Sequence, residues 1–174
     1  DREAIELPGE QLDLLKAVQA TGVPTILVLC AGSAMALGWA QENVNAIVDA
    51  WYPGAEGGNA VAKLLFGDYS PAGRLPITFY HSTDELPDFH DYSMKGRTYR
   101  YLTAEPLYPF GYGLSYTSFA YSDLKLSADK IANGDPVTVS VKVRNTGKMD
   151  GQEVVELYIK DKGASSDVPH FSLC

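Results

Sequence analysis

The sequence is poor in the residues that redox, metal and nucleic-acid sites require. Its 174 residues include two cysteines and three histidines, and Cys30 and Cys174 form no metal or redox spacing such as C-x-x-C. Lysine and arginine form no cluster and the formal net charge is -8, which argues against a nucleic-acid or anionic-membrane partner. No apolar run is long enough to span a bilayer. We therefore expect no cofactor, no metal site, no nucleic acid and no membrane partner.

The composition is otherwise that of a globular protein. Hydrophobic residues make up 45% of the sequence and charged residues 21%, enough for a sizeable core. The sequence opens on Asp1-Arg2-Glu3 without an initiator methionine or a signal-peptide pattern. We expect the chain to be a piece of a larger protein, and its localisation stays unknown.

Residues 1–80 alternate helix and strand patterns. Pro8 suits the first turn of a helix whose apolar residues recur at helical spacing, and Gly22 is a plausible end. A continuous apolar run at 25–30 is typical of a strand covered on both faces, as in a parallel sheet. The remaining expected elements are a strand at 46–51, a helix at 57–65 that begins at two glycines, and a strand at 75–79. This order predicts an α/β fold with a partly parallel sheet.

The second half of the chain has a different pattern. Residues 81–118 lose periodicity and are rich in Tyr, Pro, Gly, Asp and His, which predicts a long structured connector. From Phe119 the period becomes two, and valines alternate with polar residues at 137–143. Such alternation indicates antiparallel strands, and about half of an immunoglobulin- or fibronectin-type sandwich would fit before Cys174.

Several residues invite a catalytic interpretation that local structure explains better. Glu10 and Glu56 fall at the starts of expected helices, where the macrodipole favours a negative charge by about 0.3–1 kcal/mol. Ser33 does not satisfy the G-x-S-x-G elbow pattern, so a turn is the better interpretation. Gly54, Gly57 and Gly58 lack the following Lys-Ser/Thr of a phosphate loop, which favours close backbone packing.

A second group of residues could contact a sugar or a metal. Aromatic faces stack on sugar C–H surfaces and arginine donates paired hydrogen bonds, although the same groups can pin a connector in place. Trp51 ends a strand, close to where α/β sites form. The spacing of the histidines and aspartates fits no standard metal site. The sugar candidates are Arg97, Tyr99, Arg100, Tyr101, Trp39, Trp51 and Tyr52, and the metal candidates are His81, Asp84, His90 and Asp91.

Six groups of motifs occur in an order that resembles one enzyme family. They are Asp1-Arg2 with LPGEQ at 7–11, WYPGAEGG at 51–58, LFGDYSPAGRLPITF at 65–79, GRTYRY at 96–101, YPFGYGLSY at 108–116 and VRNTG at 143–147. Together they closely resemble the C-terminal half of family 3 glycoside hydrolases, the β-glucosidase and β-xylosidase group. The resemblance covers essentially the whole chain.

The resemblance implies a modular enzyme. A catalytic (β/α)8-type barrel precedes an α/β sandwich domain and a fibronectin type III-like domain. We expect residues 1–80 to be the later part of the α/β domain, 81–118 the connector and 119–174 a partial fibronectin-like domain. The parent would hydrolyse terminal β-linked glucose or xylose with retention.

The resemblance also places the catalytic groups elsewhere. It implies a barrel aspartate as nucleophile and a glutamate shortly upstream of Asp1-Arg2 as acid/base, so we expect no catalytic residue here and no activity of the chain alone. The alternative is a stand-alone module that is either structural or binds a carbohydrate or another partner.

Overall fold

The computed structural model describes residues 3–163 and 168–174. The first part of the chain forms helix α1 (Gly9–Gln19), strand β1 (Ile26–Leu29), helix α2 (Gly38–Asn43), strand β2 (Ala46–Asp49) and helix α3 (Gly57–Leu65). β1 and β2 pair in parallel, with Ile26 opposite Ala46 and Leu29 opposite Asp49. This confirms the parallel pairing that the apolar run at 25–30 predicts.

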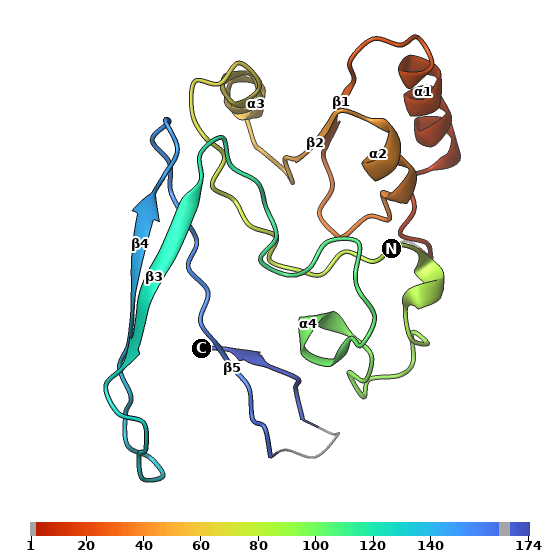
Figure 1. Ribbon diagram of the computed structural model, residues 1–174. Coiled ribbons are helices and arrows are strands. Elements are labelled where there is room, and N and C mark those ends of the chain that lie inside the picture. The colour runs from red at the N-terminus through yellow and green to blue at the C-terminus, as the bar shows by residue number, and fades with distance from the viewer. Residues whose placement is uncertain (1–2, 164–167) are drawn as a thin grey trace.

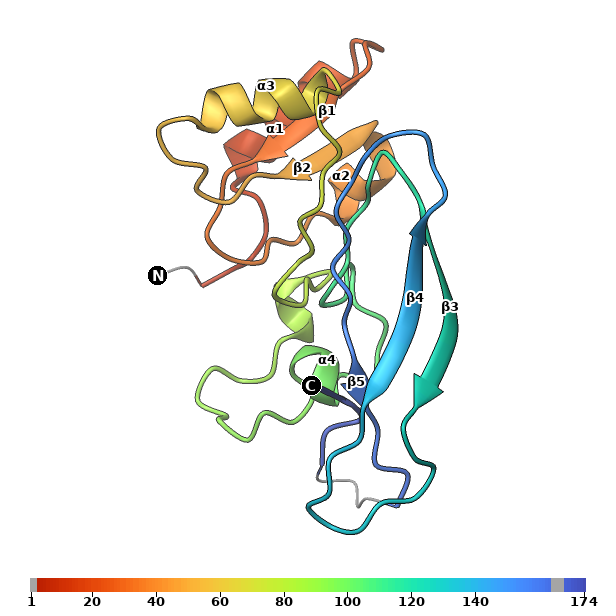
Figure 2. The ribbon, with the colours of Figure 1, turned by 90° about the vertical axis from the view of Figure 1, so that its left-hand side faces the viewer.

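The two strands lie between helices. Figure 1 shows α3 on one side of β1 and β2 and α1 and α2 on the other, and Figure 2 views these elements from the α3 side. Parallel strands are joined by crossover connections, and the helices of these connections cover the faces of the sheet. The buried apolar residues of the core cluster are Leu7, Leu15, Leu29, Met35, Leu37, Ala40 and Phe79.

Two expected elements of this half differ from the structure. The strand at 46–51 ends at Asp49, because Trp51 adopts a φ of 50° that a strand does not contain. The expected strand at 75–79 is an irregular segment with one antiparallel bridge, between Phe79 and Tyr108. Helix α2, with six residues, was not predicted, since it is too short to show a helical repeat.

The connector contains two short helices, η1 (Thr83–Glu85) and α4 (Thr98–Tyr101). It is followed by β3 (Phe119–Leu126) and β4 (Val139–Asn145), an antiparallel pair whose register shifts between Ser122 and Lys125. Strands β5 (Tyr158–Ile159) and β6 (Ser172–Leu173) form a second antiparallel pair. The antiparallel pairing of β3 and β4 is as the two-residue period predicts.

One ion pair joins the two halves of the chain. The Arg74 guanidinium donates to Glu153 Oε2 at 2.9 Å, with the two side chains 10% and 16% exposed. Tyr121 of β3 donates its hydroxyl to the other oxygen of Glu153, at 3.0 Å. Removing either partner would leave a shielded charge uncompensated, so the pair ties the segment around Arg74 to Glu153 and, through Tyr121, to β3.

Candidate functional site

The candidate site lies where β1 and β2 end, because ligands of open parallel sheets bind beyond the carboxyl ends of the strands. Asp49 is the last residue of β2, and Trp51 follows two residues later with a φ of 50°. The Trp51 N–H donates to Asp49 Oδ1 at 3.2 Å. A bulky residue at positive φ is a true conformational outlier, and such strain gathers at functional sites.

The Asp49 carboxyl is partly buried, and one of its oxygens has no hydrogen-bond partner among the described residues. Burial raises its pKa, and the hydrogen bond from Trp51 N–H offsets part of that rise. Its second oxygen, Oδ2, is buried and has no hydrogen-bond partner within residues 3–163 and 168–174. The Asp49 side chain thus holds the strained Trp51 backbone while keeping one oxygen uncommitted at the sheet edge.

A column of aromatic rings runs from this edge across the molecule. Trp51 meets Phe79 edge-on at a centroid distance of 6.5 Å, and Phe79 meets Tyr108 at 5.9 Å. Tyr108 then stacks on Tyr112 at 5.1 Å. Phe79 is only 1% exposed, so the column is anchored in the core at its centre. Edge-on and offset contacts of this kind are the favourable arrangements for ring pairs.

Tyr108 links these rings to helix α2. Its hydroxyl donates to Gln41 Oε1 of α2, and burial, followed by the neighbouring Tyr112, raises its pKa. The hydroxyl therefore stays protonated and keeps its donor role at neutral pH.

The Tyr52 ring packs against Gly32, three residues after the end of β1. A Cβ on Gly32 would lie 2.5 Å from the Tyr52 ring, so only glycine lets the ring approach the backbone there. The other side of the ring is open, since Tyr52 is 78% exposed. Trp51 and Tyr52 thus place one half-buried and one exposed aromatic side chain at the same sheet edge.

The carboxylates considered from the sequence lie at the starts of helices. Glu10 is in the first turn of α1 and Glu56 directly precedes α3. Glu56 accepts a hydrogen bond from Asn59 Nδ2 at 2.5 Å. Both carboxylates lie where the helix dipole favours a negative charge, which is the structural role that the sequence predicts.

The arginines and tyrosines of the GRTYRY motif have structural contacts. Arg97 donates to backbone carbonyls of the connector. Tyr99 packs against Phe110 at 4.6 Å and Phe171 at 5.7 Å, and the Arg100 guanidinium lies 6.0 Å from the Tyr99 ring centroid. These contacts pin α4 to the C-terminal strands.

Tyr158 of β5 completes this second group of rings. Its ring centroid is 5.8 Å from that of Tyr99 and 5.4 Å from that of Phe171. Burial, and then the hydrogen bond from its hydroxyl to Glu156 Oε2 at 2.5 Å, raise the pKa of Tyr158. The rings thus belong to a structural joint between the connector and β5.

The histidines and their acidic neighbours do not converge. His81 N–H donates to Glu85, while the His90 ring lies 3.2 Å from Asp88 Oδ1 in an exposed pair. No group of three His, Cys, Asp or Glu side chains suited to a metal occurs among the described residues. Trp39, the remaining aromatic candidate, lies on α2 with Lys16 Nζ 5.8 Å from its ring centroid.

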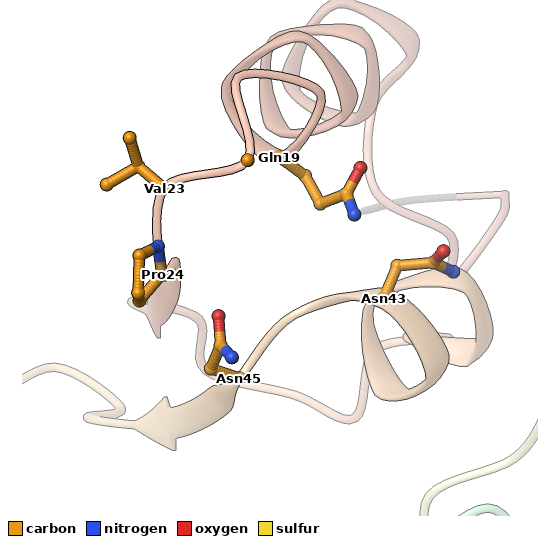
Figure 3. Close-up of a pocket in the computed structure, with 6 residues that line it drawn as sticks. Gln19, Val23, Pro24, Asn43 and Asn45 are labelled. Carbon is orange, nitrogen blue, oxygen red and sulfur yellow. The ribbon is translucent and has the colours of Figure 1, made fainter.

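A shallow depression lies at the opposite edge of the sheet (Figure 3). It has a volume of about 220 Å³ and is lined in part by Gln19, Asn43 and Asn45. The amides of both asparagines already bond to backbone: Asn43 Nδ2 donates to Trp39 O, and Asn45 Oδ1 accepts from Thr25 N. The depression has no charged lining residue, and both of its asparagines are hydrogen-bonded to backbone, so it lacks groups suited to acid/base catalysis.

The sequence analysis names Trp51 and Tyr52 of this candidate site as possible sugar contacts, but not Asp49, Tyr108 or Gln41. The sequence does contain a signal for Asp49, since it is the only charged residue in a run of apolar residues at 46–51. The sequence contains no such signal for Gln41 and Tyr108, because these two residues are separated by 67 positions of the chain.

Within the described residues, no helix is long and apolar enough to cross a membrane.

Comparison with known proteins gives consistent matches. The family model of the glycosyl hydrolase family 3 C-terminal domain matches residues 1–116. A xylan 1,4-β-xylosidase of Xylanibacter ruminicola is 52% identical over 92% of this chain and 18% of its own length. A periplasmic β-glucosidase of Salmonella typhimurium is 43% identical over 97% of this chain and 24% of its own length.

Solved structures agree with the sequence matches. A β-glucosidase from Erythrobacter marinus superposes with a TM-score of 0.86 and 44% identity, over 100% of this chain and 23% of that one. β-Glucosidase 3B from Thermotoga neapolitana gives a TM-score of 0.83 and 32% identity, over 97% of this chain and 26% of that one. The chain therefore spans about a quarter or less of the length of the relatives described here.

Proposed function

The chain belongs to glycosyl hydrolase family 3, and from that premise we propose that it forms the C-terminal part of a retaining β-glycosidase. The proposed enzyme removes terminal glucose or xylose from the non-reducing ends of β-linked glycosides. The observation that carries the proposal is the identity of 52% to a β-xylosidase and 43% to a β-glucosidase over nearly the whole chain. Both relatives are named for the cleavage of β-linked sugars.

The proposed chemistry uses two carboxylates. A retaining glycosidase needs a nucleophile and an acid/base about 5–5.5 Å apart. The nucleophile is assigned to an aspartate of a barrel domain, and the acid/base to a glutamate shortly before Asp1-Arg2, both outside residues 1–174. On this proposal the isolated chain is inactive, and its task is to complete and close the substrate pocket.

The part of the chain that meets the pocket is proposed to be the sheet edge with Trp51 and Tyr52. The Asp49 carboxylate holds the Trp51 backbone by a 3.2 Å hydrogen bond, and Phe79 supports the Trp51 ring from the core. An aromatic side chain fixed in this way suits a sugar, because its face can stack on C–H groups without losing conformational entropy on binding. Asp49 is a positioning residue in this scheme.

The domain organisation is also part of the proposal. Residues 1–80 complete an α/β sandwich domain, residues 81–118 connect, and residues 119–174 begin a fibronectin type III-like domain. Supporting observations are the parallel β1–β2 pair and the antiparallel β3–β4 pair. The apolar side chains that β3 and β4 leave exposed also fit strands that belong to a larger sandwich.

The proposal is tested with the full-length enzyme on nitrophenyl β-glucoside and nitrophenyl β-xyloside. We expect Trp51→Ala to lower kcat/KM on the better of the two substrates about tenfold or more, since positioning contacts act in the transition state. Phe66→Ala is the matched control, because Phe66 is an exposed aromatic residue at the end of α3. Equal kcat/KM for the two variants would contradict the proposed role of the sheet edge.

A further inference from the structure

The connector contains a loop at residues 86–97 whose shape is fixed from within. Arg97 Nη2 donates to three backbone carbonyls of this loop, those of Pro87 at 3.4 Å, Asp88 at 2.9 Å and Asp91 at 3.0 Å. One planar guanidinium thereby replaces the partners that these carbonyls would find in a helix or sheet. The conformation of the loop is therefore stabilised by hydrogen bonds within the loop itself.

The tip of the loop is braced by side chains as well. Asp88 Oδ1 accepts from the His90 N–H at 2.8 Å, and Asp91 Oδ1 accepts from the Ser93 N–H at 2.8 Å. The bonds from Ser93, and to a smaller extent the charge of Arg97, hold the pKa of Asp91 below its ordinary value. The Asp91 side chain therefore stays ionised at neutral pH.

Two aromatic side chains project from this braced tip. Phe89 and Tyr92 are each 84% exposed. Tyr99, in the same connector, is by contrast packed among Phe110, Tyr158 and Phe171. Leaving a large ring in water forgoes about 1.5–3 kcal/mol of burial, so two exposed rings on a rigid loop suggest a binding surface.

The loop lies on the same side of the molecule as the N-terminal segment. η1, directly before the loop, is tied to that segment: Thr83 N–H donates to Glu6 Oε1 at 2.8 Å, and Ile5 N–H donates to Thr83 Oγ1 at 3.0 Å. Figures 1 and 2 both show the light green loop projecting on the side where the N-terminal segment lies.

We propose that Phe89 and Tyr92 form an aromatic platform that binds the leaving-group side of a β-linked oligosaccharide, beyond the sugar that is cleaved. This inference rests on the proposed function, which assigns the acid/base to the sequence just before Asp1 and so brings the active site toward this side. The acid/base protonates the leaving-group oxygen, so the remainder of the glycan leaves the pocket close to it.

The chemistry of the tip fits a neutral glycan. Flat rings stack on sugar C–H faces, while the Asp88 and Asp91 carboxylates and the His90 ring can bond to hydroxyl groups. A polyanion is disfavoured by these carboxylates and by the net charge of -8. A rigid loop also loses little entropy when a flexible chain binds to it.

The test compares long and short substrates in the full-length enzyme. The ratio of kcat/KM for xylotetraose or cellotetraose to kcat/KM for the matching nitrophenyl glycoside is measured for each variant. We expect Phe89→Ala/Tyr92→Ala to lower this ratio about tenfold, because only the longer substrate reaches the platform. Phe89→Tyr/Tyr92→Phe, which keeps both rings, should restore the ratio, and Phe66→Ala should leave it unchanged.

An unaltered ratio in the double alanine variant would overturn the platform. A lower Tm together with that unaltered ratio would show that the two rings pack against another part of the enzyme instead. If the unmodified enzyme cleaves no β-glycoside, the proposed function fails separately. Calorimetric titration with xylotetraose and cellotetraose then decides the platform, with equal Kd values for the unmodified and alanine proteins overturning it.

Discussion

The first 80 residues and the segment after Phe119 use apolar side chains in opposite ways. All of the buried apolar side chains among the described residues lie between Leu7 and Tyr80. In β3 and β4, by contrast, Leu124 is 69% exposed and Leu126 is 54% exposed. A two-stranded pair has no second layer to pack against and is marginal by itself. An alternating sequence therefore predicts an apolar face without showing what covers it.

The largest expected effect contrasts a core residue with a residue of the exposed pair. Phe79→Ala should lower the free energy of unfolding by about 4 kcal/mol, because it removes a buried ring that touches Trp51 and Tyr108. Leu124→Ala should cost about 0.5 kcal/mol or less. Urea unfolding of both variants, followed by tryptophan fluorescence, measures the difference. Equal losses would remove the contrast between the two regions.

The ion pair between the two regions should give the next effect. Glu153→Gln should cost about 2 kcal/mol, because it leaves the shielded Arg74 guanidinium without its charged partner. Lys142→Gln is the control: Lys142 Nζ lies 3.7 Å from Asp123 Oδ2 in an exposed pair. The control should cost about 0.5 kcal/mol or less. The same urea titration tests this. A larger loss of unfolding free energy in the control than in Glu153→Gln would contradict the importance of the Arg74–Glu153 pair.

The smallest expected effect depends on pH and concerns Glu6. The side-chain and then the backbone hydrogen bonds from Thr83 hold the pKa of Glu6 below its ordinary value of 4.5. A carboxyl with a lowered pKa stabilises the folded state above the ordinary pKa, and this contribution is lost as the pH falls through the folded pKa. Thr83→Val should therefore cost about 1 kcal/mol at neutral pH and clearly less near pH 3. An equal cost at both pH values would contradict this.

Much of the fold was predictable because its evidence is local. The apolar run at 25–30 predicts β1, and the two glycines at 57–58 predict the start of α3 at Gly57. Gly22, expected as a helix end, has a positive φ, which glycine tolerates and most residues do not. These predictions depend on residues within one or two turns of one another.

The candidate site was less predictable because its contacts join distant residues. Trp51 was a candidate from its place after a strand, but its support by Phe79 depends on the segment at 75–79 leaving the sheet to pair with Tyr108. Likewise, Arg97 appeared as a possible sugar ligand, and only the structure shows its guanidinium engaged by three carbonyls of its own loop. Such partners are separated too far in sequence for any periodic pattern to reveal them.

We propose that this chain completes a glycosidase whose catalytic carboxylates lie outside it. The most direct measurement is hydrolysis of nitrophenyl β-glucoside and nitrophenyl β-xyloside by the 174-residue chain and by the full-length enzyme, side by side. The account predicts turnover of at least one substrate by the full-length enzyme and none by the chain. Clear turnover by the chain alone would contradict it, and would mean that a complete carboxylate pair lies within these residues.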